Sequence, residues 1–93
     1  MKSAVTVIIP AYNAEHELRL CLTGLRAGDE QPEELFVADD GSTDSTAQVA
    51  REFGATVVPT HGRVGPARAR NLAARQATGS LLVYFDEIGR AHV

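Results

Sequence analysis

With 93 residues, the chain can form one small domain and is too short for a two-domain enzyme. Its composition, 44% hydrophobic and 23% charged, is typical of a globular protein, with no apolar run that could span a bilayer and no recognisable signal peptide. The formal net charge of -3 argues against a general nucleic-acid-binding protein, and the single cysteine, Cys21, excludes an intrachain disulfide and favours a reducing compartment.

A strand and a helix are predicted at the start of the chain. Residues 5–9 form a β-branched run typical of a strand buried on both faces, and Pro10 is expected to end it. Asn13 is expected to cap the helix that follows. Apolar residues at helical spacing predict its buried face: Leu18, Cys21, Leu22 and Leu25.

The motif Asp-Asp-Gly-Ser-Thr-Asp, residues 39–44, follows the apolar strand predicted over residues 35–38. Its first two carboxylates lie where parallel strands deliver side chains to a ligand crevice. Its glycine lets the backbone turn sharply, and Ser42 is expected to cap a helix over residues 43–53. The simpler alternative is a strand-to-helix turn with an acidic cap and no ligand.

The second half of the chain continues the alternation. Residues 55–59 predict a third strand, and Pro66 suits the first turn of a third helix, which Gly79 is expected to end. Residues 81–85 predict a fourth, fully apolar strand that ends at Asp86. The order β-α-β-α-β-α-β predicts an α/β fold with a parallel sheet and right-handed crossovers.

Parallel strands bring their C-terminal ends to one edge of the sheet, so distant residues are expected to converge there. Tyr12, Asp39, Asp40 and Asp86 each come just after a predicted strand. The ring of Tyr12 is suited to lie flat beside a nucleobase, and Asp40 can accept hydrogen bonds from a base or a ribose. Asp39 is expected to stabilise the turn or the neighbouring helix N-terminus. A tyrosine that only covers the sheet edge is the alternative for Tyr12.

Four arginines fall in the third helix or in the loop before it: Arg63, Arg68, Arg70 and Arg75. The guanidinium fork suits phosphate, so this cluster is a candidate for binding a diphosphate. Arg70 is the best placed, close to the start of the helix. Arg68 and Arg75 lie on its outer flank, where a solvated face is the simpler explanation.

Asp86 is suited to a divalent cation, because Mg²⁺ and Mn²⁺ prefer carboxylate oxygen and can bridge to a diphosphate. Glu87 is expected to point to the opposite side in an extended segment and is not counted as a second ligand. The histidines lack metal-ligand spacing and are expected at the surface: His16, His61 and His92.

Four segments together resemble family 2 glycosyltransferases in order and spacing: residues 5–13, 37–44, 65–71 and 82–86. The resemblance implies a GT-A fold whose N-terminal half is Rossmann-like and binds a nucleotide. It also implies inverting transfer of a sugar from a nucleotide diphosphate-sugar, with a UDP-sugar as the expected donor, to an acceptor hydroxyl.

The resemblance further implies roles for individual residues. Ala11 and Tyr12 would border the base, Asp39 and Asp40 would belong to the nucleotide-sugar site with Asp40 on the base edge, and Arg70 would lie near the donor. Asp86 would open the family's D-x-D motif, which holds Mn²⁺ or Mg²⁺ and lets the cation offset charge on the departing diphosphate. The general base that deprotonates the acceptor is expected beyond the chain end.

The end of the chain departs from the family. Residue 88, where D-x-D needs its second acid, is isoleucine, and residues 87–93 match one reading frame of a common short-read sequencing adapter. We therefore expect residues 1–86 to be the truncated donor-binding part of a glycosyltransferase and residues 87–93 to be a non-native tail. Genomic sequence of the intact locus tests this expectation.

Two other functions stay open at this point: a non-catalytic nucleotide-binding module and a nucleotidyltransferase-like α/β enzyme. The second lacks its glycine- and arginine-rich loop after the first strand, and no dinucleotide or P-loop motif is present. The chain alone is expected to be inactive. Its intact parent is expected in the cytoplasm, at the membrane face if hydrophobic helices follow, and the acceptor is unknown.

Overall fold

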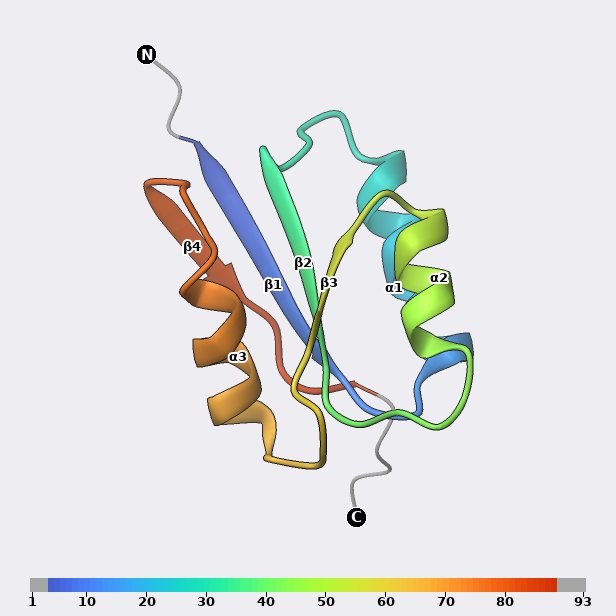
Figure 1. The fold of residues 1–93 in the computed structure, drawn as a ribbon. Helices are drawn as coiled ribbons and strands as arrows, with labels where there is room; N and C mark the ends of the chain where they lie inside the picture. Colours follow the sequence, from blue (N-terminus) through green and yellow to red (C-terminus); the bar gives the residue numbers. More distant parts are fainter. Residues whose placement is uncertain (1–3, 89–93) are drawn as a thin grey trace.

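The computed structural model describes residues 4–88 and arranges them in three layers, with helices on both faces of a sheet (Figure 1). The elements are β1 (Val5–Ala11), α1 (Glu15–Ala27), β2 (Glu34–Asp39), α2 (Thr46–Glu52), β3 (Thr56–Pro59), α3 (Pro66–Ala74) and β4 (Leu81–Tyr84). All strand pairs are parallel, in the order β3-β2-β1-β4. The predicted α/β fold with a parallel sheet is confirmed.

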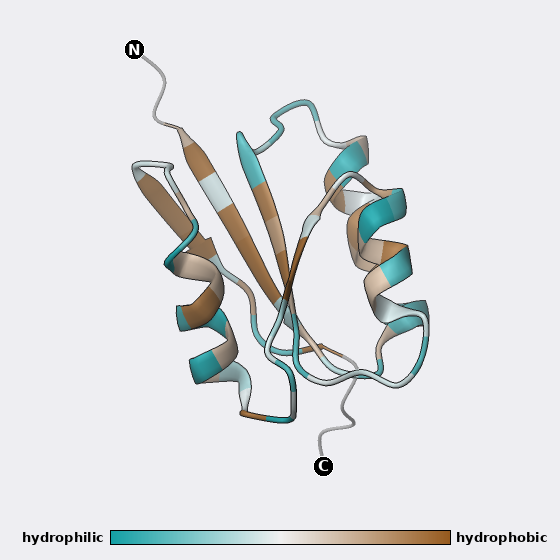
Figure 2. Cartoon of the chain, viewed as in Figure 1, coloured by the Kyte–Doolittle hydropathy of each residue, from teal (hydrophilic) through white to brown (hydrophobic). Residues whose placement is uncertain are grey.

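The hydrophobic core lies on both faces of the sheet, which explains why β1 and β2 are apolar on both sides. One face packs against α1 and α2 through a core that includes Val7, Ile9, Leu18, Leu22, Val37 and Val49. The opposite face packs against α3 through Ile8, Phe36, Ala38, Val58, Ala69 and Ala73. Figure 2 shows the hydrophobic strands between helices whose outer surfaces are hydrophilic.

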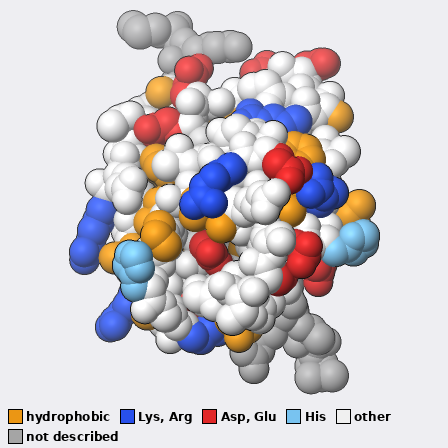
Figure 3. Space-filling view, turned by 45° about the vertical axis from the view of Figure 1, so that its right-hand side comes forward, with side chains coloured by type: hydrophobic (Ala, Val, Ile, Leu, Met, Phe, Trp, Pro, Cys, Tyr) orange, Lys and Arg blue, Asp and Glu red, His pale blue; other side chains and the backbone are white. Residues whose placement is uncertain are grey.

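Charges of both signs lie on the surface. Figure 3 shows acidic and basic side chains interspersed over one side of the molecule. Among residues 4–88, no helix combines the length and the apolar composition needed to cross a bilayer.

β1 continues through Pro10 to Ala11, so the prediction that Pro10 ends the strand is wrong. The carbonyl of Pro10 accepts a hydrogen bond from the Ile88 N–H at 3.2 Å, on the side of β1 that faces β4. A residue's nitrogen and carbonyl point to the same side of a strand, so the proline nitrogen also faces this side. β4 ends at Tyr84, opposite Ile8. No regular ladder bond is therefore lost at Pro10.

α3 and β4 are shorter than predicted. α3 ends at Ala74 in tight turns, and β4 ends at Tyr84 instead of residue 85. Gly79 does not end the helix. It packs closely on Thr6 of β1 and on Ala4 just before that strand; an added Cβ would lie 2.9 Å from the Ala4 carbonyl oxygen, so close approach explains the glycine.

A carboxylate joins three segments at the edge of the sheet where the strands begin. Glu34 accepts hydrogen bonds from the Thr6 hydroxyl at 2.6 Å, the Thr78 N–H at 2.8 Å and the Gly79 N–H at 2.9 Å. The bond from Thr6, followed by that from Thr78, lowers the pKa of Glu34 from 4.5 to about 2. Glu34 therefore links β2 by hydrogen bonds to β1 and to the α3–β4 connection.

Glu34→Gln should lower the free energy of unfolding near neutral pH, because the amide carries no negative charge for these donors and its NH₂ group cannot accept the bond that the Thr78 hydroxyl donates to Glu34 Oε2 at 3.0 Å. The folded pKa lies below the ordinary value of 4.5, so the stabilisation is complete above about pH 4.5 and is lost as the pH falls towards about 2. Urea unfolding followed by circular dichroism at several pH values measures the effect. The wild type should lose more stability in acid than Glu34→Gln, and the exposed neighbour's variant, Glu33→Gln, should follow the wild type. Equal acid dependence of the wild type and Glu34→Gln would contradict this role.

Candidate functional site

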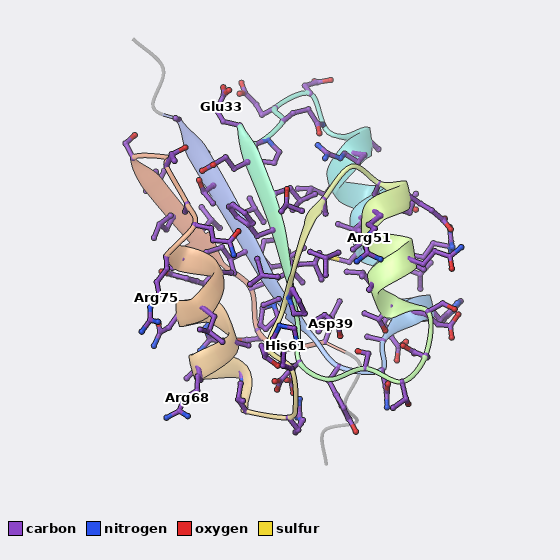
Figure 4. The ribbon with its side chains drawn as sticks, in the orientation of Figure 1. Glu33, Asp39, Arg51, His61, Arg68 and Arg75 are labelled. Atoms are coloured by element: carbon purple, nitrogen blue, oxygen red, sulfur yellow. The ribbon has the colours of Figure 1, made fainter. Side chains whose placement is uncertain are left out.

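The segments that leave the C-terminal ends of the strands are held together at one edge of the sheet. Asp40 N–H donates to the Ala11 carbonyl at 2.9 Å, Thr60 N–H to the Asp39 carbonyl at 3.1 Å, and Tyr12 N–H to the Ile88 carbonyl at 3.2 Å. Figure 4 shows Asp39 and His61 at this edge and Glu33 at the opposite one. The predicted convergence of Tyr12, Asp39 and Asp40 is confirmed.

The motif of residues 39–44 holds the start of α1, and neither predicted helix cap is present. Asn13 lies in the left-handed region with φ 45°, and its N–H donates to the Ser42 hydroxyl oxygen at 2.9 Å. Its side-chain oxygen accepts from the Thr43 N–H at 2.7 Å. α1 begins at Glu15 and α2 at Thr46, so Asn13 and Ser42 join two loops instead of capping their helices.

The N–H groups at the start of α1 find acceptors in this same turn. Ala14 N–H donates to the Thr46 hydroxyl at 2.8 Å, and Glu15 N–H donates to the Asp44 carboxylate at 3.3 Å. Burial alone would raise the pKa of Asp44, but hydrogen bonds from Thr46 outweigh it and the pKa is lowered. These side chains therefore serve as caps from a segment about thirty positions away.

Asp39 accepts a hydrogen bond from the Ser42 N–H at 3.1 Å. This contact matches the turn-stabilising role expected from the sequence. A part for Asp39 in binding a ligand stays a prediction.

Asp40 is fully buried, and its carboxylate is surrounded by donors from the loop between β3 and α3. Oδ1 accepts from the Thr60 hydroxyl and the Val64 N–H, both at 2.8 Å. Oδ2 accepts from the Gly65 N–H and Arg63 Nη1, both at 2.9 Å. Burial acts to raise the pKa of Asp40, but these hydrogen bonds and the charge of Arg63 outweigh it and lower the pKa. Asp40 is thus an ionised group that organises the loop.

Arg63 is the cation that meets Asp40 and Tyr12. Its Cζ lies 4.1 Å from the centroid of the Tyr12 ring, and its two Nη atoms also bind Glu87 at 2.6 and 2.9 Å. The hydrogen bonds that Arg63 donates to Glu87 are the main cause that raises the pKa of Arg63. The sequence placed Arg63 among four arginines and favoured Arg70. A lone arginine in a glycine-containing loop belongs to no periodic pattern. The sequence therefore does not indicate that Arg63 lies beside Asp40, and only the folded loop shows it.

The segment that contains Glu87 does not continue the regular pairing of β4 with β1. Ile8 pairs with Tyr84 but Ala11 pairs with Ile88, so three steps along β1 face four steps along the segment after β4. This extra residue is a bulge, which re-aims the side chains around it. Glu87 is engaged by Arg63, and Asp86 is exposed. The exclusion of Glu87 as a cation ligand stays a prediction.

None of the remaining candidates is a donor to the Asp40 carboxylate. Arg70 is half-buried on α3, and Ala11 is fully buried at the end of β1. Figure 4 shows Arg68 and Arg75 on the outer side of α3, pointing away from the sheet as expected. His16 and His61 are exposed, and His92 lies outside the described residues.

A cavity of about 150 Å³ lies away from this edge. It opens beside β1 and the end of α1, and its lining residues are Val5, Val7, Leu25, Glu30, Gln31 and Pro32. It includes none of the residues that converge at the C-terminal edge.

Among residues 4–88 there is no cluster of three or more histidine, cysteine or acidic side chains that could enclose a metal ion. Asp86 supplies one exposed carboxylate, and position 88 supplies none. A small hard cation is often held by one or two carboxylates together with substrate phosphates. The residues present therefore fit a cation that reaches the protein with a diphosphate, and do not fit a cage made by the described residues alone.

Comparison with known proteins identifies the family. The family described as Glycosyl transferase family 2 matches residues 6–87. The chain belongs to glycosyl transferase family 2. Its described residues correspond to the Rossmann-like part of the GT-A fold, as the resemblance implied.

Two glycosyltransferases are similar over most of this chain. Glycosyltransferase GlyA of Streptococcus pneumoniae is 30% identical over 86 residues, which cover 88% of this chain and 12% of that protein. Glycosyltransferase AglE of Haloferax volcanii is 30% identical over 89 residues, which cover 88% of this chain and 29% of that protein. The chain thus spans less than a third of the length of either relative.

Solved structures share the fold. Glucosyl-3-phosphoglycerate synthase from Mycobacterium tuberculosis, crystallised with Mn²⁺, UDP and glucosyl-3-phosphoglycerate, aligns with a TM-score of 0.77 and 28% identity over 90% of this chain and 33% of that one. The mannosyltransferase PcManGT from Pyrobaculum calidifontis, in complex with GDP-Man and Mn²⁺, aligns with a TM-score of 0.78 and 32% identity over 92% of this chain and 28% of that one.

Gly41→Ala should disturb the candidate site and destabilise the chain by about 1–3 kcal/mol. Gly41 has φ 85°, and an added Cβ would lie 3.0 Å from the Gly62 carbonyl carbon and 3.2 Å from the Arg63 nitrogen. Urea unfolding measures the loss. Gly24→Ala is the matched control: nothing lies within 4 Å of its added Cβ in α1, so it should stabilise the chain by about 0.5–1 kcal/mol. Equal effects of the two substitutions would show that the contact with the 60–65 loop is unimportant.

Proposed function

We propose that this chain is the donor-binding part of an inverting glycosyltransferase that takes a sugar from a nucleoside diphosphate-sugar. The observation that carries the proposal is the placement of Tyr12 and Asp40 together at the C-terminal edge of a parallel sheet, in a chain that belongs to glycosyl transferase family 2. This edge is where open α/β sheets bind ligands. UDP is the first candidate nucleotide and GDP the second, because similar structures hold one or the other.

Each of the candidate residues has a separate role in binding the donor. Ala11 and Tyr12 border the base, with the Tyr12 ring as the stacking surface. Asp40 accepts hydrogen bonds from the base edge, and Asp39 supports the turn that presents it. Arg70, on the first turns of α3, supplies positive charge towards the donor.

A divalent cation is part of the proposal, since two similar structures contain Mn²⁺ with a nucleotide. Asp86 is the residue that would hold it, with diphosphate oxygens as the remaining anionic ligands. When bound, the cation offsets the negative charge that builds on the departing diphosphate.

The reaction assigned to the intact enzyme is a displacement at the anomeric carbon. The acceptor oxygen forms the new bond from one side while the bond to the nucleoside diphosphate breaks on the other, which inverts the configuration. A general base takes the hydroxyl proton. No residue among 4–88 is assigned to that role, so the residues described here bind and orient the donor.

Tyr12→Ala should weaken binding of UDP or GDP about tenfold, because one base-stacking surface is lost. Isothermal titration of the protein expressed from the uninterrupted reading frame measures the change. Tyr12→Phe keeps the ring and should bind within about twofold of the wild type. Asp40→Ala is a poorer probe, because it also removes the acceptor that holds the 60–65 loop. Equal affinity of Tyr12→Ala and the wild type would remove Tyr12 from the site.

Asp86→Asn should abolish most of the gain in nucleotide affinity that Mn²⁺ provides, and leave affinity without metal unchanged. The reason is that an amide oxygen carries no charge for a hard cation. Titration of UDP with and without Mn²⁺ measures both quantities in the same intact protein. Asp29→Asn, at an exposed position before β2, is the matched control and should keep the full Mn²⁺ effect. A full Mn²⁺ effect in Asp86→Asn as well would place the cation elsewhere.

A further inference from the structure

Arg63 makes the two kinds of contact that a nucleobase would make at this edge. Its flat guanidinium lies over the Tyr12 ring, with Cζ 4.1 Å from the ring centroid. Its Nη1 donates to Asp40 Oδ2 at 2.9 Å. A base that stacks on Tyr12 and donates an N–H to Asp40 would satisfy the same two partners.

These two contacts cannot be shared with a base. An ionised carboxylate has about four acceptor positions, and Asp40 already accepts four hydrogen bonds. One guanidinium reaches both Asp40 and the ring, so the covered ring face and the carboxylate lie on the same side. A base that reaches both groups must therefore take the place of the guanidinium.

Arg63 is also the donor that can leave most easily. Two of the other donors to Asp40 are backbone N–H groups of Val64 and Gly65, directly before α3, and the third is the short hydroxyl side chain of Thr60. Arg63 holds Asp40 by the end of a long side chain that is 31% exposed, while Asp40 is 0% exposed. Rotation of this side chain would free one acceptor position and leave the backbone in place.

We propose that Arg63 occupies the base subsite of the free protein and that a nucleotide binds by displacing its guanidinium from Tyr12 and Asp40. The inference rests on the proposed function and adds a competitor that belongs to the chain itself. Arg63 thereby lowers nucleotide affinity and keeps the buried Asp40 charge paired until the base arrives. Arg63 also donates to Glu87 at 2.6 and 2.9 Å, and displacement of the guanidinium breaks or re-forms these two bonds as well.

Arg63→Met tests the proposal, because methionine is long and apolar and offers no donor to Asp40. In the protein from the uninterrupted reading frame, it should bind UDP or GDP about fivefold more tightly than the wild type in metal-free titrations. Arg68→Met, on the exposed outer face of α3, is the matched control and should leave affinity unchanged. Equal or weaker binding by Arg63→Met would overturn the proposal.

A second measurement uses the wild type alone and does not depend on the variant folding. The ring current of Tyr12 should shift the Arg63 side-chain proton resonances upfield in the free protein, and saturating UDP or GDP should remove that shift. Nucleotide binding with an unchanged shift would overturn the role of Arg63 and leave the proposed function intact. Failure of the wild type to bind either nucleotide would overturn the proposed function itself.

Discussion

The buried carboxylate of Asp40 is the interaction on which the ligand-facing edge of this protein depends. An unpaired carboxylate at a fully buried position would cost several kcal/mol, so the chain around it must supply donors. All four donors come from one loop, residues 60–65, and this loop leads directly into α3. Asp40 thereby sets where α3 begins and brings Arg63 over Tyr12.

The motif that contains Asp40 organises the fold in two directions. Asp40 itself accepts hydrogen bonds from the loop that follows β3. The rest of the motif, with Thr46, holds the loop that follows β1. It accepts hydrogen bonds from the N–H groups of Asn13, Ala14 and Glu15. One short turn thus positions Tyr12 on one side and the 60–65 loop on the other. A glycine is required at the contact, because a Cβ added at Gly41 would lie 3.0 Å from the Gly62 carbonyl carbon.

The order of the elements was predictable because it depends on local signals. Apolar runs of strand length and helical spacing indicated all seven elements, and their alternation indicated the parallel sheet. The predicted ends of strands and helices were wrong where a neighbouring segment determines them. Pro10 remains in β1 because β4 has already ended opposite it, and Asn13 and Ser42 bind each other's loops instead of capping helices. Helix caps at distant positions leave no sequence pattern to detect.

The sequence by itself determined that this is a small parallel α/β domain, and it predicted Tyr12, Asp39, Asp40 and Asp86 at one edge, because strand direction alone sends the residues at strand ends there. Only the tertiary structure decided which of these side chains already bind other groups of the protein. It showed that Asp40 already accepts four hydrogen bonds, that Arg63 and not Arg70 is the cation beside it, and that a bulge lies between Tyr84 and Ile88, in the segment of Asp86 and Glu87. The reason is physical: strand order follows from local periodicity, whereas the pairing of buried charges depends on loops that meet only in the folded chain.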